Sequence, residues 1–308
     1  MYNSFFGFDS DPFRVNPDPR FLYMSESHAE ALATLVYAVQ ERKGFITLTG
    51  EVGTGKTTIL NALLQKLGST VQTAYIFNTS LTVEDLFAAL FEELELPPVE
   101  PFRKTAALSR LNQHLIQRLS DGLQTLLIVD EAQNLSDEML EEIRMLSNLE
   151  TPQSKLLQIM LVGQPELAEK LSRPALRQLR QRVELRHAIR PLRAEETALY
   201  IRERLVVAGH PRGDVFAGPA EKAVHRYARG IPRVINVLCD NALIAAYARE
   251  SGHVSAQMVE SSASDLGLSL SPHEPHFVRE GGSSEPRART GWLRRLWRRG
   301  GAGARPEL

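Results

Sequence analysis

The chain has 308 residues and is balanced in charge, with 36 lysines and arginines against 37 acidic residues. A hydrophobic content of 43% is ordinary for a globular protein, and the single cysteine, Cys239, excludes a disulfide framework. No apolar run approaches the roughly 20 residues of a membrane-spanning helix. The near-zero net charge argues against a dedicated nucleic-acid binder. We therefore expect a soluble, intracellular protein of enzyme size.

The first 25 residues are rich in aromatic residues and contain Pro12, Pro17 and Pro19. Proline fixes its own φ and restricts the residue before it, so we expect this segment to be extended rather than helical. Its aromatic side chains are expected to pack on the main domain. From residue 27 to 42 apolar residues recur at helical spacing, which predicts a helix.

Short β-like runs then alternate with helical patterns. The expected strands cover residues 45–49, 74–77, 126–129, 159–162 and 183–186. The expected helices lie near residues 57–67, 82–94, 105–120 and 136–149. The first, third and fourth strands are nearly continuous apolar runs, which is typical of parallel strands covered on both faces. The alternation predicts an α/β core with a parallel sheet over residues 26–190. An all-helical unit is expected to follow over residues 191–265.

Residues 266–308 differ in composition from the rest of the chain. Their glycine- and serine-rich stretches cannot support a core, so most of this tail is expected to be disordered. Within it, residues 292–299 place two tryptophans and two leucines opposite four arginines on a helical wheel, a pattern typical of a helix lying in a membrane surface. Eight residues make a marginal helix by themselves. A disordered tail, or a peptide that docks on a partner protein, therefore stays open.

A glycine-rich segment joins the first expected strand to the following helix. Residues 50–57 match the pattern G-x-x-x-x-G-K-[ST] in full. Backbone N–H groups in such a loop form an anion-binding nest, and the helix dipole adds positive potential. Lys56 is expected to reach the β- and γ-phosphates of a nucleotide, and the Thr57 hydroxyl to ligate Mg²⁺. The expected nucleotide contacts are Gly50, Glu51, Val52, Gly53, Thr54, Gly55, Lys56, Thr57 and Thr58.

Two acids, Asp130 and Glu131, come directly after the third expected strand. A carboxylate at this place can hold the magnesium ion or its waters, and we assign this role to Asp130. Glu131 is then placed to orient and deprotonate an attacking water. A P-loop kinase has no need of such an acid, and the guanine-reading N-K-x-D motif of a GTPase is absent from the sequence. The pair therefore predicts hydrolysis of ATP with Mg²⁺.

Six arginines crowd residues 173–190, around the last expected strand. An arginine supplied to a neighbour's nucleotide can stabilise charge in the transition state, although such a run is also typical of a solvated basic face. Further on, residues 230–233 (Gly-Ile-Pro-Arg) are expected to end one helix and begin the next. In that arrangement the Arg233 side chain would start from a rigid turn between the two helices.

The phosphate loop, the acid pair, the arginine-bearing segment and residues 230–233 together resemble an AAA+ ATPase. A narrower resemblance, over about residues 1–262, is to the ExeA/GspA-type ATPases of the general secretion pathway. It rests on Phe5-Phe-Gly7, Pro12-Phe13, Pro17-Asp-Pro19, Phe21-Leu-Tyr23, His28-Ala-Glu-Ala-Leu32, Arg42-Lys-Gly-Phe45, residues 50–58, Asp130-Glu-Ala-Gln133, Val162-Gly-Gln-Pro165 and residues 230–233. Relatives occur beside exosortase and polysaccharide-export systems and, more distantly, among transposition ATPases.

The resemblance implies a sheet of order 5-1-4-3-2 and a helical lid, with the nucleotide held between lid and core. It implies that Gln164 is sensor 1, Arg233 is sensor 2, and Arg182 is the arginine finger, with Arg180 as second choice. It further implies that the segment around residues 21–28 closes over the adenine. Secretion-type members continue into a membrane span and a peptidoglycan-binding domain that this sequence does not contain, so we do not expect direct action on the cell wall.

The expected function is a self-assembling ATPase switch or motor that serves secretion, envelope or polysaccharide-export proteins. We expect it in the cytoplasm, with contact to the inner face of the cytoplasmic membrane through residues 292–299. Two alternatives stay open. One is a DNA-associated regulator of the transposition type, which no helix-turn-helix supports. The other is a nucleotide-gated scaffold with little turnover, which has no need of the intact Glu131.

Overall fold

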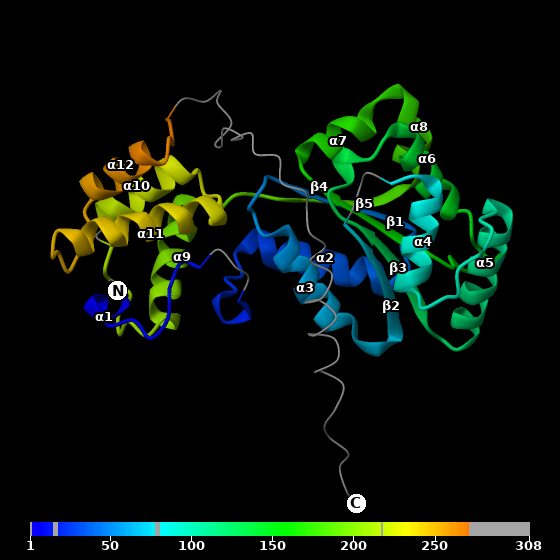
Figure 1. Cartoon of the computed structure of the whole chain (residues 1–308), viewed down its shortest axis with the longest axis horizontal. Coiled ribbons are helices and arrows are strands. Elements are labelled where there is room, and N and C mark those ends of the chain that lie inside the picture. Colours follow the sequence, from blue (N-terminus) through cyan, green and yellow to red (C-terminus); the bar gives the residue numbers. More distant parts are fainter. Residues whose placement is uncertain (1, 15–17, 78–80, 217, 271–308) are drawn as a thin grey trace, which may run out of the picture. The chain divides into compact units, whose positions relative to one another are not determined.

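The computed structural model describes residues 2–14, 18–77, 81–216 and 218–270, which form one compact unit. The amphipathic segment at residues 292–299 lies outside the described residues. Figure 1 shows a central sheet with helices on both faces, followed along the chain by a group of helices, α9 to α12. Within the described ranges, no helix is both long and apolar enough to cross a membrane.

The sheet of the described chain has five parallel strands. They are β1 (Phe45–Gly50), β2 (Val71–Ile76), β3 (Gln124–Val129), β4 (Gln158–Gly163) and β5 (Val183–Ile189). Their order is β2-β3-β4-β1-β5, which is the predicted order read from the other edge. Every residue of β1 and β4 is buried, because helices cover both faces and leave no polar side for alternation. The predicted fold class is confirmed.

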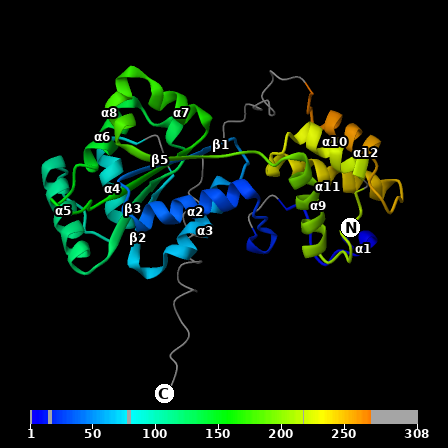
Figure 2. The same ribbon diagram turned by 180° about the vertical axis from the view of Figure 1, so that it is seen from behind.

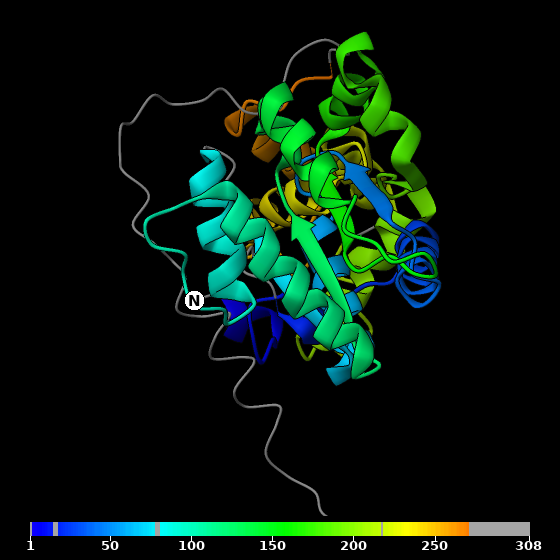
Figure 3. The same ribbon diagram turned by 90° about the vertical axis from the view of Figure 1, so that its right-hand side faces the viewer.

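Helices cover each face of this sheet and bury separate apolar clusters against it. On one face lie α2 (Glu26–Gln40) and α3 (Lys56–Leu67). On the other lie α4 (Val83–Glu93), α5 (Lys104–Ser120), α6 (Asp137–Leu146), α7 (Pro165–Ser172) and α8 (Arg177–Arg182). Figure 2 shows α2 in front of the strands, and in Figure 3 the cyan and green helices α4 and α5 are nearest the viewer. The short 3-10 turns are η1 (Pro19–Phe21), η2 (Gly68–Thr70), η3 (Ala132–Asn134) and η4 (Pro174–Leu176).

The helices that follow β5 share a third apolar cluster. They are α9 (Ala194–Val207), α10 (Gly218–Ala228), α11 (Pro232–Ala248) and α12 (Ala256–Asp265). We call this group the helical lid. Cys239 on α11 is completely buried in its cluster. The lid is joined to the end of β5 by residues 190–193.

The N-terminal segment differs from its sequence-based expectation in two ways. Tyr2–Phe6 forms a short helix, α1, because no proline lies within these residues to prevent a helical turn. The aromatic side chains of Phe6, Phe8, Phe13 and Phe21 are buried in the apolar cluster of the lid and not against the sheet layer. The expectation that this segment packs on the α/β core is therefore wrong.

A buried arginine on α9 explains why the N-terminal segment packs on the lid. The Nε of Arg204 donates to the carbonyl oxygen of Pro12 (2.6 Å), and its Nη1 donates to the Tyr200 hydroxyl (3.1 Å). The guanidinium carbon lies 4.6 Å from the centre of the Phe21 ring. In the described part of the chain, the groups that contact this guanidinium are backbone carbonyl oxygens, the Tyr200 hydroxyl and aromatic rings. Backbone carbonyls and aromatic faces of the N-terminal segment therefore stabilise the buried charge.

Replacing this guanidinium should loosen the N-terminal segment. Arg204→Met keeps an apolar stem but leaves the Pro12 carbonyl without its donor, so we expect the free energy of unfolding to fall by about 1–3 kcal/mol. Chymotrypsin should then cleave within residues 5–23 faster than in the wild type. Arg212→Met is the matched control, because the Arg212 side chain is 81% exposed. Equal cleavage rates in Arg204→Met and the control would contradict the anchoring role.

Candidate active site

The phosphate loop runs from the end of β1 to the start of α3 and requires its glycines. Gly53 and Gly55 have φ of +82° and +97°, in the left-handed region that favours glycine. A Cβ on Gly53 would lie 2.5 Å from the Arg233 Cβ, and one on Gly55 would lie 2.9 Å from the His28 Nε2. The loop is thus in close contact with the first turn of α11 on one side and with α2 on the other.

Lys56 is the first residue of α3, and its side chain is buried beneath the loop. Its Nζ donates to the carbonyl oxygens of Gly50 (2.7 Å) and Glu51 (3.1 Å). Burial lowers the pKa of Lys56 from its ordinary value, while the negative charges of Glu131 and Asp130 oppose that shift. The ammonium group and the two acids therefore occupy one electrostatic site, as the motifs predict. The Thr57 side chain, on the same turn of α3, is exposed.

Asp130 follows β3 and is buried, with a hydrogen bond to each carboxylate oxygen. The Tyr75 hydroxyl on β2 donates to Oδ2 (2.6 Å), and the Glu131 N–H donates to Oδ1 (2.8 Å). Burial, followed by the charge of Asp130, raises the pKa of Tyr75, so this hydroxyl stays protonated and remains a donor. Carboxylate and hydroxyl oxygens are the ligands that Mg²⁺ prefers, so the pair of Asp130 and Thr57 fits that ion chemically.

Glu131 has a left-handed backbone, with φ of +53°, which is uncommon for a residue with a side chain. Its Oε2 accepts hydrogen bonds from the Nε2 of Gln133 (2.6 Å) and the Nε2 of Gln164 (3.3 Å). Gln164 lies directly after β4, so the structure brings the predicted sensor residue to the predicted acid. Gln133 and Tyr75 had no predicted role. Gln133 was part of a matched motif, whereas nothing local in the sequence distinguishes Tyr75.

Arg233 lies beside the loop at the start of α11. The backbone N–H of Arg233 donates to the carbonyl oxygen of Gly53 (3.2 Å). Gly230 has φ of +73°, and a Cβ there would lie 2.0 Å from the Leu192 carbonyl oxygen, so the turn before α11 requires glycine. Pro232 then occupies the first turn of the helix, as its position predicts.

Arg180 and Arg182 lie on α8 and have other partners. The Nη1 of Arg180 donates to the Ser172 carbonyl oxygen (3.4 Å), and the Nη2 of Arg182 donates to the Asn148 Oδ1 (2.9 Å). Within the described residues, neither guanidinium is hydrogen-bonded to the phosphate loop or the acid pair. Their role as arginine fingers stays a prediction about a neighbouring copy.

The start of α2 contacts the phosphate loop through His28. The His28 Nε2 donates to the carbonyl oxygen of Thr54 (2.8 Å), and its Nδ1 lies 2.6 Å from the Ser25 Oγ. Because a carbonyl oxygen can only accept, Nε2 carries the proton, and Nδ1 accepts from the Ser25 hydroxyl. Burial lowers the pKa of His28, which favours this neutral form.

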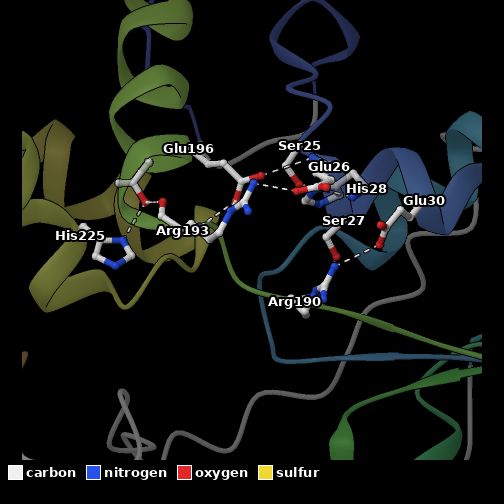
Figure 4. A network of polar contacts seen from close by, with 10 residues as sticks. Ser25, Glu26, Ser27, His28, Glu30, Arg190, Arg193, Glu196 and His225 are labelled. Atoms are coloured by element: carbon white, nitrogen blue, oxygen red, sulfur yellow. Dashed lines mark hydrogen bonds and ion pairs between the residues drawn. The ribbon is translucent and has the colours of Figure 1, made fainter.

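The same helix start also contacts residues 190–193 and the lid (Figure 4). The Ser27 Oγ accepts from the Arg190 N–H (3.0 Å), and the Arg193 guanidinium is 2.7 Å from the Glu26 carboxylate. Exposed ion pairs such as the latter contribute little to stability by themselves. Ser27 and His28 therefore make the buried connections by which one helix start contacts both the phosphate loop and the segment leading into the lid.

Comparisons with known proteins agree with this architecture. Residues 39–171 match a protein family described as "AAA domain". "General secretion pathway protein A" of Aeromonas hydrophila is 48% identical over 255 residues, which cover 82% of this chain and 46% of that protein. The chain thus spans about half the length of this relative. It belongs to the ExeA/GspA-type AAA ATPases, and the predicted resemblance is confirmed.

Solved structures share the fold at low identity. The Aeropyrum pernix ORC2 protein, in its ADPNP-ADP complexes, has a TM-score of 0.61 at 20% identity, over 83% of this chain and 71% of that chain. Drosophila ORC bound to DNA has a TM-score of 0.63 at 19% identity, over 84% of this chain and 65% of that chain. At such identities the likeness shows the fold alone.

The hydrogen bond between Tyr75 and Asp130 should stabilise the folded chain. Tyr75→Phe leaves one oxygen of a buried carboxylate without its donor, so we expect the free energy of unfolding to fall by about 1–3 kcal/mol in urea titrations. Tyr37→Phe is the control, because the Tyr37 side chain is 54% exposed. If both variants unfolded at the same urea concentration as the wild type, the Tyr75 contact would contribute nothing.

Proposed function

We propose that this chain, an AAA-type P-loop ATPase of the ExeA/GspA type, works as a magnesium-dependent, self-assembling switch. The observation that carries this proposal is the shared site of Lys56, Asp130 and Glu131 beside a glycine loop. A buried ammonium next to two carboxylates, at the end of parallel strands and at the start of a helix, suits a triphosphate with its metal.

Each residue of the site would have a separate role in the binding and hydrolysis of ATP. The N–H groups of the loop and the start of α3 would bind the phosphates, with the Lys56 ammonium at the β- and γ-phosphate oxygens. Asp130 and the Thr57 hydroxyl would hold Mg²⁺, which supplies neutralisation of phosphate charge when it is bound. Arg233, beside Gly53, would contact the nucleotide from the lid.

Glu131 would act as the general base. Its carboxylate accepts a proton from the attacking water, the water oxygen bonds to the γ-phosphorus, and the bond from that phosphorus to the β–γ bridging oxygen breaks. ADP and inorganic phosphate are released. The Gln164 amide, bonded to the same carboxylate, would sense the γ-phosphate from the end of β4.

We place the assembled protein on the cytoplasmic side of a secretion, envelope or polysaccharide-export system. The support is the name of the Aeromonas hydrophila relative, which assigns that protein to the general secretion pathway. In such an assembly Arg182, or Arg180 as second choice, would be supplied from α8 to the nucleotide of a neighbouring copy. Residues 292–299 would provide peripheral contact with the membrane.

Two variants separate nucleotide binding from hydrolysis. Lys56→Ala removes the phosphate-binding charge and should abolish ATP binding. Glu131→Gln should keep the dissociation constant for ATP within a few-fold while kcat falls by about 10²–10⁴, the range of general-base catalysis. Fluorescent-nucleotide titration and phosphate release measure the two effects. Glu169→Gln, an exposed acid on α7, is the control. Normal hydrolysis by Glu131→Gln would overturn the assignment of the base.

An arginine finger supplied by a neighbouring copy should change the rate of ATP hydrolysis when variant and wild-type proteins are mixed. Arg182→Ala, mixed with an equal amount of wild-type protein, should reduce phosphate release below the sum of the two separate rates, because variant copies disable adjacent sites. Arg177→Ala, an exposed arginine of the same helix, should leave the mixture additive. Additive rates with Arg182→Ala would count against a finger at this position.

A further inference from the structure

We propose that Gln133 is a positioning residue that sets the orientation of the Glu131 carboxylate. This inference rests on the proposed role of Glu131 as the general base. Gln133 lies on η3, two residues after that acid, and among the described residues its hydrogen-bond partners are Glu131, Gln164 and Lys170. Its contacts join the acid at the end of β3 to the residue that follows β4.

The direction of the Gln133 side-chain amide is determined by its two partners. Its Oε1 accepts from the Gln164 N–H (3.0 Å), and its Nε2 donates to the Glu131 Oε2 (2.6 Å). Rotating the amide by 180° would place an NH₂ group against an N–H donor and an oxygen against a carboxylate. The observed orientation is therefore the one in which Gln133 donates to the acid.

The position of Gln133 is restrained from two sides. A Cβ on Gly163 would lie 2.5 Å from the Gln133 Oε1, so the glycine at the end of β4 leaves the space that the amide occupies. The Lys170 Nζ donates to the Gln133 carbonyl oxygen (3.3 Å) and also to that of Leu135. Side chain and backbone are thus both held, which restricts the rotamers available to the amide.

The two carboxylate oxygens of Glu131 have different surroundings. The amides of Gln133 and Gln164 both donate to Oε2, while Oε1 accepts no hydrogen bond from any residue that the structure describes. Oε1 is therefore the oxygen available to an attacking water. The shorter bond, from Gln133, is the stronger restraint on the carboxylate. Without it, Glu131 would lose much of its preference for this orientation, and proton transfer would slow.

Two substitutions at position 133 distinguish the effect of the hydrogen bond that Gln133 donates from the effect of its side-chain packing. Gln133→Met has a similar length but no hydrogen-bonding groups, so we expect kcat to fall by about 10- to 100-fold with KM for ATP within about two-fold of wild type. Gln133→Glu can still accept from the Gln164 N–H but places a second carboxylate against Glu131. We therefore expect a larger loss of kcat from Gln133→Glu than from Gln133→Met. Gln113→Met, at an exposed glutamine on α5, is the control.

A second measurement tests the contact without relying on activity. The two facing carboxylates of the Gln133→Glu variant should lower the Tm, because like charges at this distance repel. Adding Glu131→Gln to that variant should restore the Tm, because the amide introduced at position 131 can donate to the carboxylate introduced at position 133. Without restoration of the Tm, the two side chains would not be in contact.

The outcomes distinguish this inference from the proposed function. If Glu131→Gln is inactive but Gln133→Met keeps the wild-type kcat, Gln133 has no positioning role. The assignment of Glu131 as the general base is then retained. A smaller loss of kcat in Gln133→Glu than in Gln133→Met would likewise overturn the role of the donor. If Glu131→Gln hydrolyses ATP normally, the assignment of the base itself fails.

Discussion

The parallel arrangement of β3, β4 and β1 as neighbouring central strands is the constraint on which the site depends. Thr49 of β1 pairs with Gly163 of β4, and Val129 of β3 pairs with Leu161. In a parallel sheet this register brings the carboxyl ends of the strands to one edge, where ligands bind in open α/β folds. The phosphate loop, the acid pair and Gln164 therefore meet there, although they lie far apart along the chain.

Neutral groups hold the charges of this site in place. Lys56 donates to carbonyl oxygens, Asp130 accepts from a tyrosine hydroxyl, and Glu131 accepts from two amides. These partners satisfy buried polar groups without neutralising them by ion pairing. Such preorganised groups suit a reaction in which charge develops on transferring phosphate oxygens, because the protein reorganises little when the reaction occurs.

Much of the fold was predictable from the sequence. Parallel strands that are buried on both faces are nearly continuous apolar runs, and helices show apolar residues at the spacing of the helical turn. The sheet order followed from the family resemblance. The packing of the N-terminal segment was not predictable, because it depends on Arg204, whose Pro12 partner lies 192 residues away in the sequence. The contacts of Tyr75 and His28 in the site were missed for a related reason: they arise when separate strands and helices meet, and such contacts leave no local pattern. Gln133 lay in a matched motif, but its bond to the Gln164 N–H depends on the pairing of β3 with β4, which the motif does not show.

The central claim is that this edge of the sheet hydrolyses ATP in an assembly of copies. Phosphate release per protomer, measured against protein concentration with Mg²⁺ and with EDTA, tests it most directly. The account predicts turnover that requires Mg²⁺ and rises per protomer with concentration as copies complete each other's sites. Phosphate release that is absent at every concentration, or that persists unchanged in EDTA, would contradict it.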